Sequence, residues 1–120
     1  MSGTGILLLA HGSRDPNWKL SFEAIGEETR RRFRGPVGLA YLESMSPDFA
    51  AGIDELAAQG VERIRIVPVF LAAGSHIRVH IPELVAAAKI RYDKIEFHLA
   101  IPAGEAAIVR QAIASFAIEQ

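Results

Sequence analysis

Residues 5–16 read GILLLAHGSRDP, an aliphatic run that stops abruptly at a histidine and continues in turn-forming and polar residues. Consecutive branched aliphatic side chains are typical of a strand that is buried on both faces, as in a parallel sheet. Asp15 and Pro16 then form a helix-start signal, because aspartate caps helices and proline is favoured at the first helical position. The stretch therefore predicts a buried strand, a loop that begins at His11, and a helix that begins near Pro16.

The rest of the chain repeats this order of strand and helix. Three more short runs are rich in branched and aromatic residues, namely VGLAYLE (37–43), IRIVPVF (64–70) and IEFHLAI (95–101). Residues at helical spacing lie between and after them: Trp18, Phe22, Ile25, Thr29 and Phe33; Phe49, Ile53 and Leu56; and Ile108, Ala112, Ile113 and Phe116. Four strand–helix units predict an α/β fold with a four-stranded, mostly parallel sheet and helices on both faces.

The ends of these helices can also be predicted. Ser46 before Pro47 places a cap and a first helical residue at the start of the second helix, and Gly35 and Gly60 mark helix ends. A third helix is expected to begin near Pro82 and to run through ELVAAAK. No linker or low-complexity tract divides the chain, so we expect residues 1–120 to form a single domain.

Composition narrows the classes of function. The 120 residues are 50% hydrophobic and 22% charged with a net charge of −1, which is typical of a soluble globular protein and offers no basic tract for nucleic acid. The chain has no cysteine, so any metal ion must be bound by His, Asp or Glu. The start, MSGTGILLLA, has neither the charges of a signal peptide nor the length of a membrane span. We therefore expect a cytoplasmic protein whose partners include neither nucleic acid nor membrane.

Three side chains capable of binding a metal follow the first three predicted strands. These are His11, Glu43 and His76, each about one strand–helix unit from the next. The carboxyl ends of parallel strands share one edge of a sheet, and ligands of such sheets bind there. Two imidazoles and a carboxylate suit Fe, Co, Ni or Zn and leave coordination positions open for a substrate. The sequence thus predicts a metal site at this edge.

Each of these residues also has an ordinary structural explanation. A lone histidine at a strand end is more often a hydrogen-bonded loop residue than a ligand, and Glu43 is equally suited to cap the following helix. His98 alternates with apolar residues and is expected to be a packed or edge histidine, while His80 is expected to serve the start of the third helix. The occurrence of three such side chains at one edge favours the metal site.

The same loops contain small residues and arginines. Two glycine–serine pairs adjoin the histidines, Gly12 with Ser13 and Gly74 with Ser75. They allow the backbone to approach a flat or anionic ligand closely, although ordinary turns use the same residues. Arg14 and Arg78 lie a few residues beyond the histidines, where a guanidinium is placed to bind carboxylates of a ligand, and as isolated surface arginines they would need no explanation.

Taken together, these motifs resemble a known family. The segments LLLAHGSRDP (7–16), YLESMSP (41–47) and PVFLAAGSHIRVHIP (68–82) are similar to those of the small, single-domain CbiX sirohydrochlorin chelatases, which belong to the class II chelatases. The resemblance covers nearly the full chain. It implies a flavodoxin-like chelatase half-domain that inserts a divalent metal ion into the tetrapyrrole sirohydrochlorin, as in cobalamin or sirohaem biosynthesis. Cobalt is the metal expected first, followed by nickel or iron.

The resemblance also implies roles for residues. The metal-binding histidines of the family match His11 and His76, and a carboxylate of its larger members matches Glu43, as a ligand or proton acceptor. Arg14 and Arg78 are expected to face the acidic side chains of the macrocycle. Small family members form homodimers, so the macrocycle is expected between two subunits. The metal enters as a substrate, and no nucleotide is expected because the chain has no G-x-x-x-x-G-K-S/T loop.

One position departs from the family pattern. Family members usually continue H-V-x-x-D-I-P after the second histidine, whereas this chain has His80 in place of the aspartate. His80 is itself a candidate metal ligand, so the change bears on metal preference. It also leaves open a non-catalytic carrier of metal or tetrapyrrole. A flavodoxin-like phosphate or flavin binder is disfavoured, because no strand end offers a phosphate-binding loop.

Overall fold

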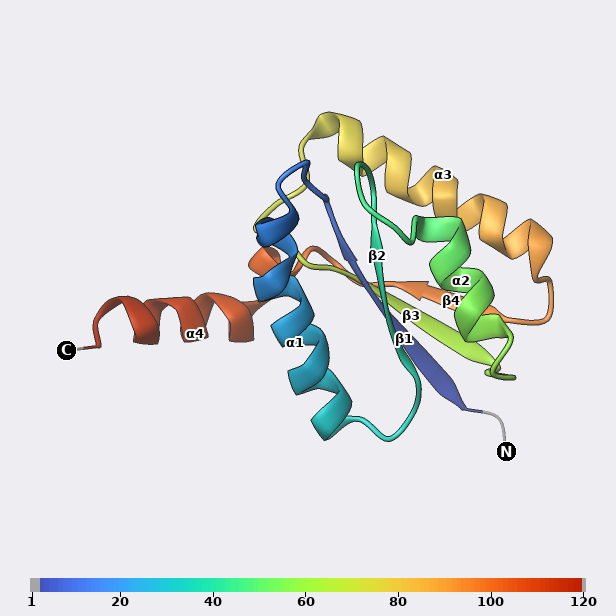
Figure 1. Ribbon diagram of the computed structural model, residues 1–120, viewed down its shortest axis with the longest axis horizontal. Helices are drawn as coiled ribbons and strands as arrows, with labels where there is room; N and C mark the ends of the chain where they lie inside the picture. Colours follow the sequence, from blue (N-terminus) through green and yellow to red (C-terminus); the bar gives the residue numbers. More distant parts are fainter. Residues whose placement is uncertain (1–2, 120) are drawn as a thin grey trace.

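The computed structural model describes residues 3–119, and its centre is one four-stranded sheet (Figure 1). The strands are β1 (Thr4–Ala10), β2 (Val37–Tyr41), β3 (Arg63–Pro68) and β4 (Glu96–Leu99). All neighbours in the order β2-β1-β3-β4 are parallel, and Leu7 of β1 pairs with Gly38 on one side and Ile66 on the other. The predicted α/β fold with a parallel sheet is confirmed, and all four carboxyl ends lie at one edge.

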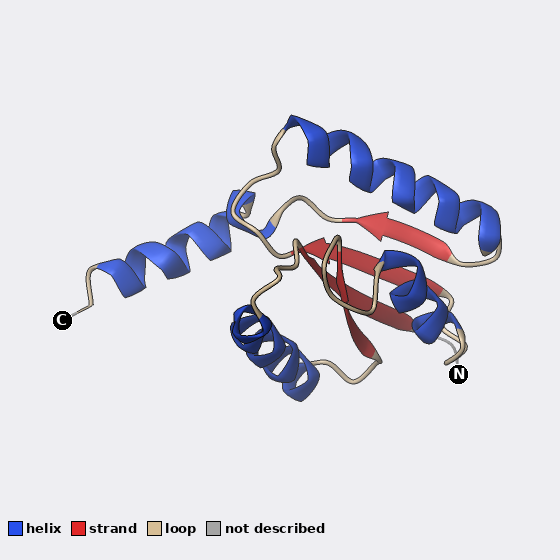
Figure 2. Ribbon diagram, turned by 45° about the horizontal axis from the view of Figure 1, so that its top comes forward, coloured by secondary structure: helices blue, strands red, loops and turns tan. Residues whose placement is uncertain are grey.

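Three helices cover the two faces of the sheet unequally (Figure 2). They are α1 (Lys19–Arg32), α2 (Phe49–Ala57) and α3 (Ser75–Arg91). Leu7 and Leu9 of β1 belong to the larger core, which they form with side chains of α2 and α3. Leu8 faces the other way and packs with Phe22 of α1 and Tyr41. Successive strand residues point to opposite faces, so the continuous aliphatic run of β1 fills both cores.

The second helix begins two residues later than its sequence predicts. The side chain of Asp48, not that of Ser46, caps α2 by accepting a hydrogen bond of 2.9 Å from the Ala51 N–H. Pro47 precedes this cap, and its carbonyl accepts a hydrogen bond of 2.9 Å from the Tyr41 N–H. Pro47 therefore extends the pairing beyond β2 and does not occupy the first turn of a helix.

The third helix begins seven residues before the expected start at Pro82, and that prediction is wrong. It begins at Ser75 after an extended Gly74, so Pro82 lies inside the helix. Proline in a helix removes one backbone hydrogen bond. Ile81 and Val85 are buried against the sheet from the same helix, and their burial offsets that loss. The apolar stripe of α3 thus overrides the local preference of proline.

The last helix, α4 (Ala107–Ala117), follows the short helix η2 (Ala103–Glu105) and projects away from the sheet (Figure 1). The predicted helix is confirmed, but no residue of α4 is buried, and Ile108 and Phe116 are each 75% exposed. The face of β3 and β4 on the side of α1 is consequently open, with Arg65 and His98 exposed on it. No helix among the described residues is long and apolar enough to cross a membrane.

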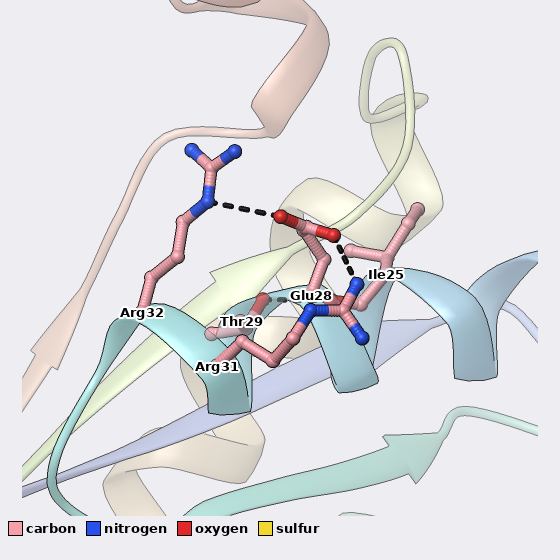
Figure 3. A network of polar contacts seen from close by, with 5 residues as sticks. All are labelled: Ile25, Glu28, Thr29, Arg31 and Arg32. Carbon is pink, nitrogen blue, oxygen red and sulfur yellow. Dashed lines mark hydrogen bonds and ion pairs between the residues drawn. The ribbon is translucent and has the colours of Figure 1, made fainter.

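The first helix ends in a network of charged side chains (Figure 3). Glu28 accepts hydrogen bonds from Arg31 and from Arg32, the latter at 3.0 Å from Nε. The hydrogen bond and positive charge of Arg31 are the main causes that lower the pKa of the Glu28 carboxyl. Cations in the last turn also complement the negative end of the helix dipole. All three side chains are exposed, so the network stabilises the surface of α1.

Candidate functional site

The loops after β1 and β2 lie side by side at the carboxyl edge of the sheet. His11 follows the last residue of β1, and its carbonyl accepts a hydrogen bond of 3.0 Å from the Glu43 N–H. One residue earlier, the Leu42 N–H donates to the Ala10 carbonyl at 2.9 Å. The backbones of His11 and Glu43 are therefore neighbours, as their places at the ends of adjacent strands predict. Asp48 caps α2, so the alternative explanation of Glu43 as that cap does not apply.

Gly12 is the residue that lets these two loops approach so closely. Its φ is +94°, and a Cβ built at this position would lie 1.9 Å from the carbonyl oxygen of Glu43. Both the backbone angle and the space therefore require glycine. Ser13, next to it, accepts a hydrogen bond of 3.1 Å from the Asp15 N–H, which is ordinary turn chemistry. Arg14, between Ser13 and Asp15, is exposed.

The ring of His11 lies against Phe70, a residue that the sequence analysis did not single out. The two ring centroids are 4.5 Å apart and the planes are tilted by 38°. Phe70 follows β3, where the Val69 N–H donates to the Leu9 carbonyl at 2.7 Å and so joins the ends of β1 and β3. The available signal was an aromatic residue at the last position of an apolar run. Phe70 limits the rotation of His11 and shields one side of its ring from water.

His76 lies not in a loop, as expected, but in the first turn of α3, because that helix starts earlier than predicted. Gly74 is the residue before the helix and Ser75 is its first residue. His80 is one turn further on, and the two imidazole rings are stacked, with centroids 5.8 Å apart and planes 12° from parallel. His76 is exposed and His80 is half-buried. The spacing of four residues is the signal for this pair, but a helix that is expected to start only at Pro82 does not include either histidine.

The metal-capable side chains form two groups. One comprises His11 beside the loop of Glu43, and the other comprises His76 and His80. Within residues 3–119 no three side chains of the types His, Cys, Asp or Glu come close enough together to hold one ion. The three-ligand site of His11, Glu43 and His76 is not assembled in this conformation and stays a prediction.

A hollow of about 380 Å³ adjoins the second group. It lies between the start of α3 and the chain after β4, with Ile77, Arg78 and Ile81 on one side and Leu99, Pro102 and Glu105 on the other. The Arg78 Nε donates to the Ala73 carbonyl at 3.2 Å, which fixes the guanidinium over the loop that leads into α3. The hollow is therefore mainly apolar with one cation and one carboxylate on its walls.

A second, more open hollow of about 840 Å³ lies beside Glu43. Its walls are the loop of residues 41–48 and the first turns of α2. Ser44 in this loop has a φ of 66°, a left-handed conformation that is uncommon for a residue other than glycine. An open hollow thus lies beside Glu43, and a mainly apolar one lies beside the start of α3.

His98, the fourth histidine, lies on the edge strand β4 and is exposed. Its Nδ1 is 3.1 Å from Nη1 of Arg65 on β3. The expectation of an edge histidine is confirmed, and His98 belongs to neither metal-capable group.

Comparison with known proteins gives the family of the chain. A family model described as CbiX matches residues 5–120. The chain belongs to the CbiX family. The match begins at the second residue of β1 and spans the rest of the strands and helices described above, including both histidine groups at the carboxyl edge.

Two curated relatives show how far the similarity of this CbiX chain extends. It is 38% identical over 81 residues to the sirohydrochlorin cobaltochelatase of Methanothermobacter thermautotrophicus, covering 68% of this chain but only 57% of that protein. It is 35% identical over 106 residues to the sirohydrochlorin cobaltochelatase of Saccharolobus solfataricus, covering 83% of this chain and 82% of that protein.

A solved structure shows the same fold. The sirohydrochlorin chelatase SirB from Bacillus subtilis subspecies spizizenii, determined in complex with cobalt, matches this CbiX chain with a TM-score of 0.83 and 27% identity. The match covers 94% of this chain and 49% of the SirB chain. One copy of the fold described here therefore corresponds to about half of that chelatase.

Proposed function

We propose that this chain inserts a divalent metal ion into sirohydrochlorin, with cobalt as the metal expected first and nickel or iron as alternatives. The observation that carries the proposal is that two imidazoles lie at the carboxyl edge of a CbiX-family sheet, His11 in the loop after β1 and His76 in the first turn of α3, which follows β3. Relatives named sirohydrochlorin cobaltochelatase and a chelatase structure with cobalt support the reaction and the metal. Metal insertion requires that the site release its ion, and a site with few protein ligands does so more readily than one in which the protein fills every coordination position.

His11, His76 and Glu43 are the residues proposed to act on the metal. His11 and His76 hold the ion, and Glu43, whose backbone is bonded to that of His11, is a further ligand or proton acceptor. Insertion displaces two protons from ring nitrogens of the macrocycle. Imidazole and carboxylate side chains are the usual proton acceptors in such steps. Phe70 holds the His11 ring in place for this step.

The macrocycle itself is proposed to contact the loops beside these histidines. Arg78, fixed by its bond to Ala73, and Arg14, exposed after β1, bind carboxylates of the ring. The glycine–serine pairs at residues 12–13 and 74–75 allow the backbone to approach its flat face. Residues 1–120 act in this proposal as one chelatase half-domain.

A second copy of the chain is proposed to supply the other wall of the macrocycle site. The exposed apolar face of α4 supports a homodimer, because Ile108, Ile113 and Phe116 are unburied in the single chain. The length of the SirB match supports it too, since two copies of this chain correspond to one SirB chain. Both observations favour a pair of half-domains as the working unit.

Incubation of the purified protein with sirohydrochlorin and Co²⁺, Ni²⁺ or Fe²⁺ in turn tests the function. The absorption spectrum of the macrocycle changes when the metal enters. We expect the protein to accelerate this change above the spontaneous rate for at least one metal, cobalt first. Rates equal to the spontaneous rate for all three metals would contradict the proposal.

A non-catalytic carrier of metal or tetrapyrrole is the second candidate function. One observation favours it, namely His80 at the position where the family usually has aspartate. A carrier binds metal or macrocycle in stoichiometric amounts and stops there. Repeated turnover with the protein at a small fraction of the substrate concentration distinguishes a chelatase from a carrier.

A further inference from the structure

The pair of histidines at the start of α3 has the arrangement of a metal-chelating unit. His76 and His80 are four residues apart and so lie on one face of the helix. Their rings are stacked at 5.8 Å between centroids. The first is exposed and the second is half-buried, so ions in solution have access to the pair.

The separation of the rings fits a single shared ion. A metal–nitrogen distance of about 2.1 Å and tetrahedral coordination place the centres of two imidazoles about 5 Å apart. The 5.8 Å of this structure is slightly larger. Rotation of the two side chains changes this distance and the direction of the ring nitrogens, while the helix holds the two Cβ atoms about 6 Å apart.

We propose that His76 and His80 together chelate the divalent metal ion, and that His80 sets the metal preference of this chain. The pair holds the ion first, and His11 and Glu43 complete its coordination as it passes to the macrocycle. This delivery role rests on the proposed function, whereas binding of the ion to the pair stands without it. The pair supplies two ligands to the ion. No third His, Asp or Glu of the described residues lies close enough to join them, so the other coordination positions of the ion are open to water or substrate.

The chemistry of the pair predicts which ions it prefers. Two imidazoles favour Co²⁺, Ni²⁺, Cu²⁺ and Zn²⁺ over Mg²⁺ and Mn²⁺, whereas an aspartate at residue 80 would shift the site toward oxygen-preferring ions. The positive end of the helix dipole opposes a cation at this place, and so does the guanidinium of Arg78 on the same turn. Both effects weaken the site, which suits an ion that is to be passed on.

Calorimetric titration of the full chain with CoCl₂, NiCl₂ and MnCl₂ tests the proposal. The variants are His80→Gln, which removes the ligand, and His80→Asp, which restores the usual family residue. His98→Gln is the matched control, because it removes an exposed imidazole on β4 that contacts Arg65 and not the pair. We expect Co²⁺ and Ni²⁺ to bind His80→Gln and His80→Asp about tenfold or more weakly than the unmodified chain. Binding to His98→Gln is expected to be unchanged.

Nuclear magnetic resonance of the unmodified protein provides a test that needs no variant. On titration with Zn²⁺, a diamagnetic ion with the same preference for imidazole, the ring signals of His76 and His80 are expected to shift together and at the same concentrations. A stationary His80 ring, or full Co²⁺ affinity in His80→Gln, would overturn the proposal. If metal binds the pair but no insertion into sirohydrochlorin occurs, the proposed function fails and the pair stands. If insertion proceeds while His80→Gln binds metal normally, the pair fails and the function stands.

Discussion

Gly12 shows how one residue positions the chemistry of this edge. It follows His11 and lets the loop of Glu43 pass at backbone contact distance. Any side chain at this position would collide with the Glu43 carbonyl. The relation between His11 and Glu43 therefore depends on the absence of a side chain between them.

Replacement of Gly12 by alanine is expected to lower the free energy of unfolding by more than its left-handed backbone angle alone explains. Gly60 is the matched control, since its φ of +80° is similar but a Cβ there meets nothing within 4 Å. Gly60→Ala is expected to lower the free energy of unfolding by about 1 kcal/mol and to leave metal insertion unchanged. Gly12→Ala is expected to lower it at least twice as much and to reduce the insertion rate. Urea unfolding measures the free energy of unfolding, and the insertion assay measures the rate. Equal effects of the two substitutions would contradict the close approach of residue 12 to the Glu43 carbonyl.

Helices α2 and α3 are joined on the surface by a polar contact. The Tyr92 hydroxyl donates to Oδ1 of Asp54 at 2.5 Å, and Arg91 forms an ion pair with the same oxygen. The hydrogen bond from Tyr92, followed by that from Arg91, lowers the pKa of the Asp54 carboxyl. A carboxyl whose pKa is lower in the folded state stabilises the fold above its unfolded pKa, and this contribution is lost as the pH falls through the folded pKa.

Asp54→Asn tests this contact and its pH dependence. At pH 7 we expect the substitution to lower the free energy of unfolding by about 1 kcal/mol or less, because the contact is largely exposed. The difference from the unmodified protein is expected to shrink as the pH falls below about 4, the usual aspartate pKa in an unfolded chain, and on through the lower pKa of the folded carboxyl. Urea unfolding between pH 3 and pH 7 measures it, with the exposed Asp93→Asn as control. A difference that is constant or grows toward low pH would show that Asp54 is not stabilised by its charge.

At the level of elements, the sequence predicts the four strands well and helix starts less well. Apolar runs give the strands because burial in the sheet depends on those side chains directly. The predicted helix start at Pro82 is wrong because the burial of Ile81 and Val85 outweighs the preference of proline for the first turn. The predicted cap at Ser46 is wrong because Asp48, two residues later, has the extended backbone of a cap and accepts the capping hydrogen bond. Where two helix-start signals lie close together in the sequence, packing against the sheet decides which one is used, and the sequence pattern does not show that packing.

The candidate site was predictable to the extent that strand ends determine it. The places of His11 and Glu43 at adjacent strand ends follow from the order of strands and helices. The stacking of His76 on His80 does not, because it depends on the true start of α3. The contact of Phe70 with His11 likewise depends on how the loops after β1 and β3 meet in space.

For the whole molecule, α4 is the element that a single chain leaves without a packing partner. Its helical spacing is evident in the sequence, but its apolar face stays exposed in the described structure. Helix periodicity predicts that a face is to be buried and does not identify the surface that buries it. A second copy of the chain is the proposed partner.

The mass of the protein in solution tests this partner. Light scattering after gel filtration is expected to give twice the 13.0 kDa chain mass. Phe116→Glu, which places a charge on the exposed face of α4, is expected to shift the population toward the single chain. Ile90→Glu is the matched control at an 83% exposed position of α3 and is expected to leave the mass unchanged. A monomer for the unmodified protein, or a dimer that Phe116→Glu does not weaken, would contradict an interface through α4.

The central claim is that imidazoles at the carboxyl edge of the sheet deliver a metal ion to a tetrapyrrole. Its most direct test is Co²⁺ insertion into excess sirohydrochlorin by the unmodified protein and by His11→Ala, His76→Ala and His98→Ala. We expect many turnovers per chain, a loss of about 100-fold or ~2.7 kcal/mol for each of the first two variants, and no loss for the third. Insertion that stops after one equivalent, or full rates in both His11→Ala and His76→Ala, would contradict the claim.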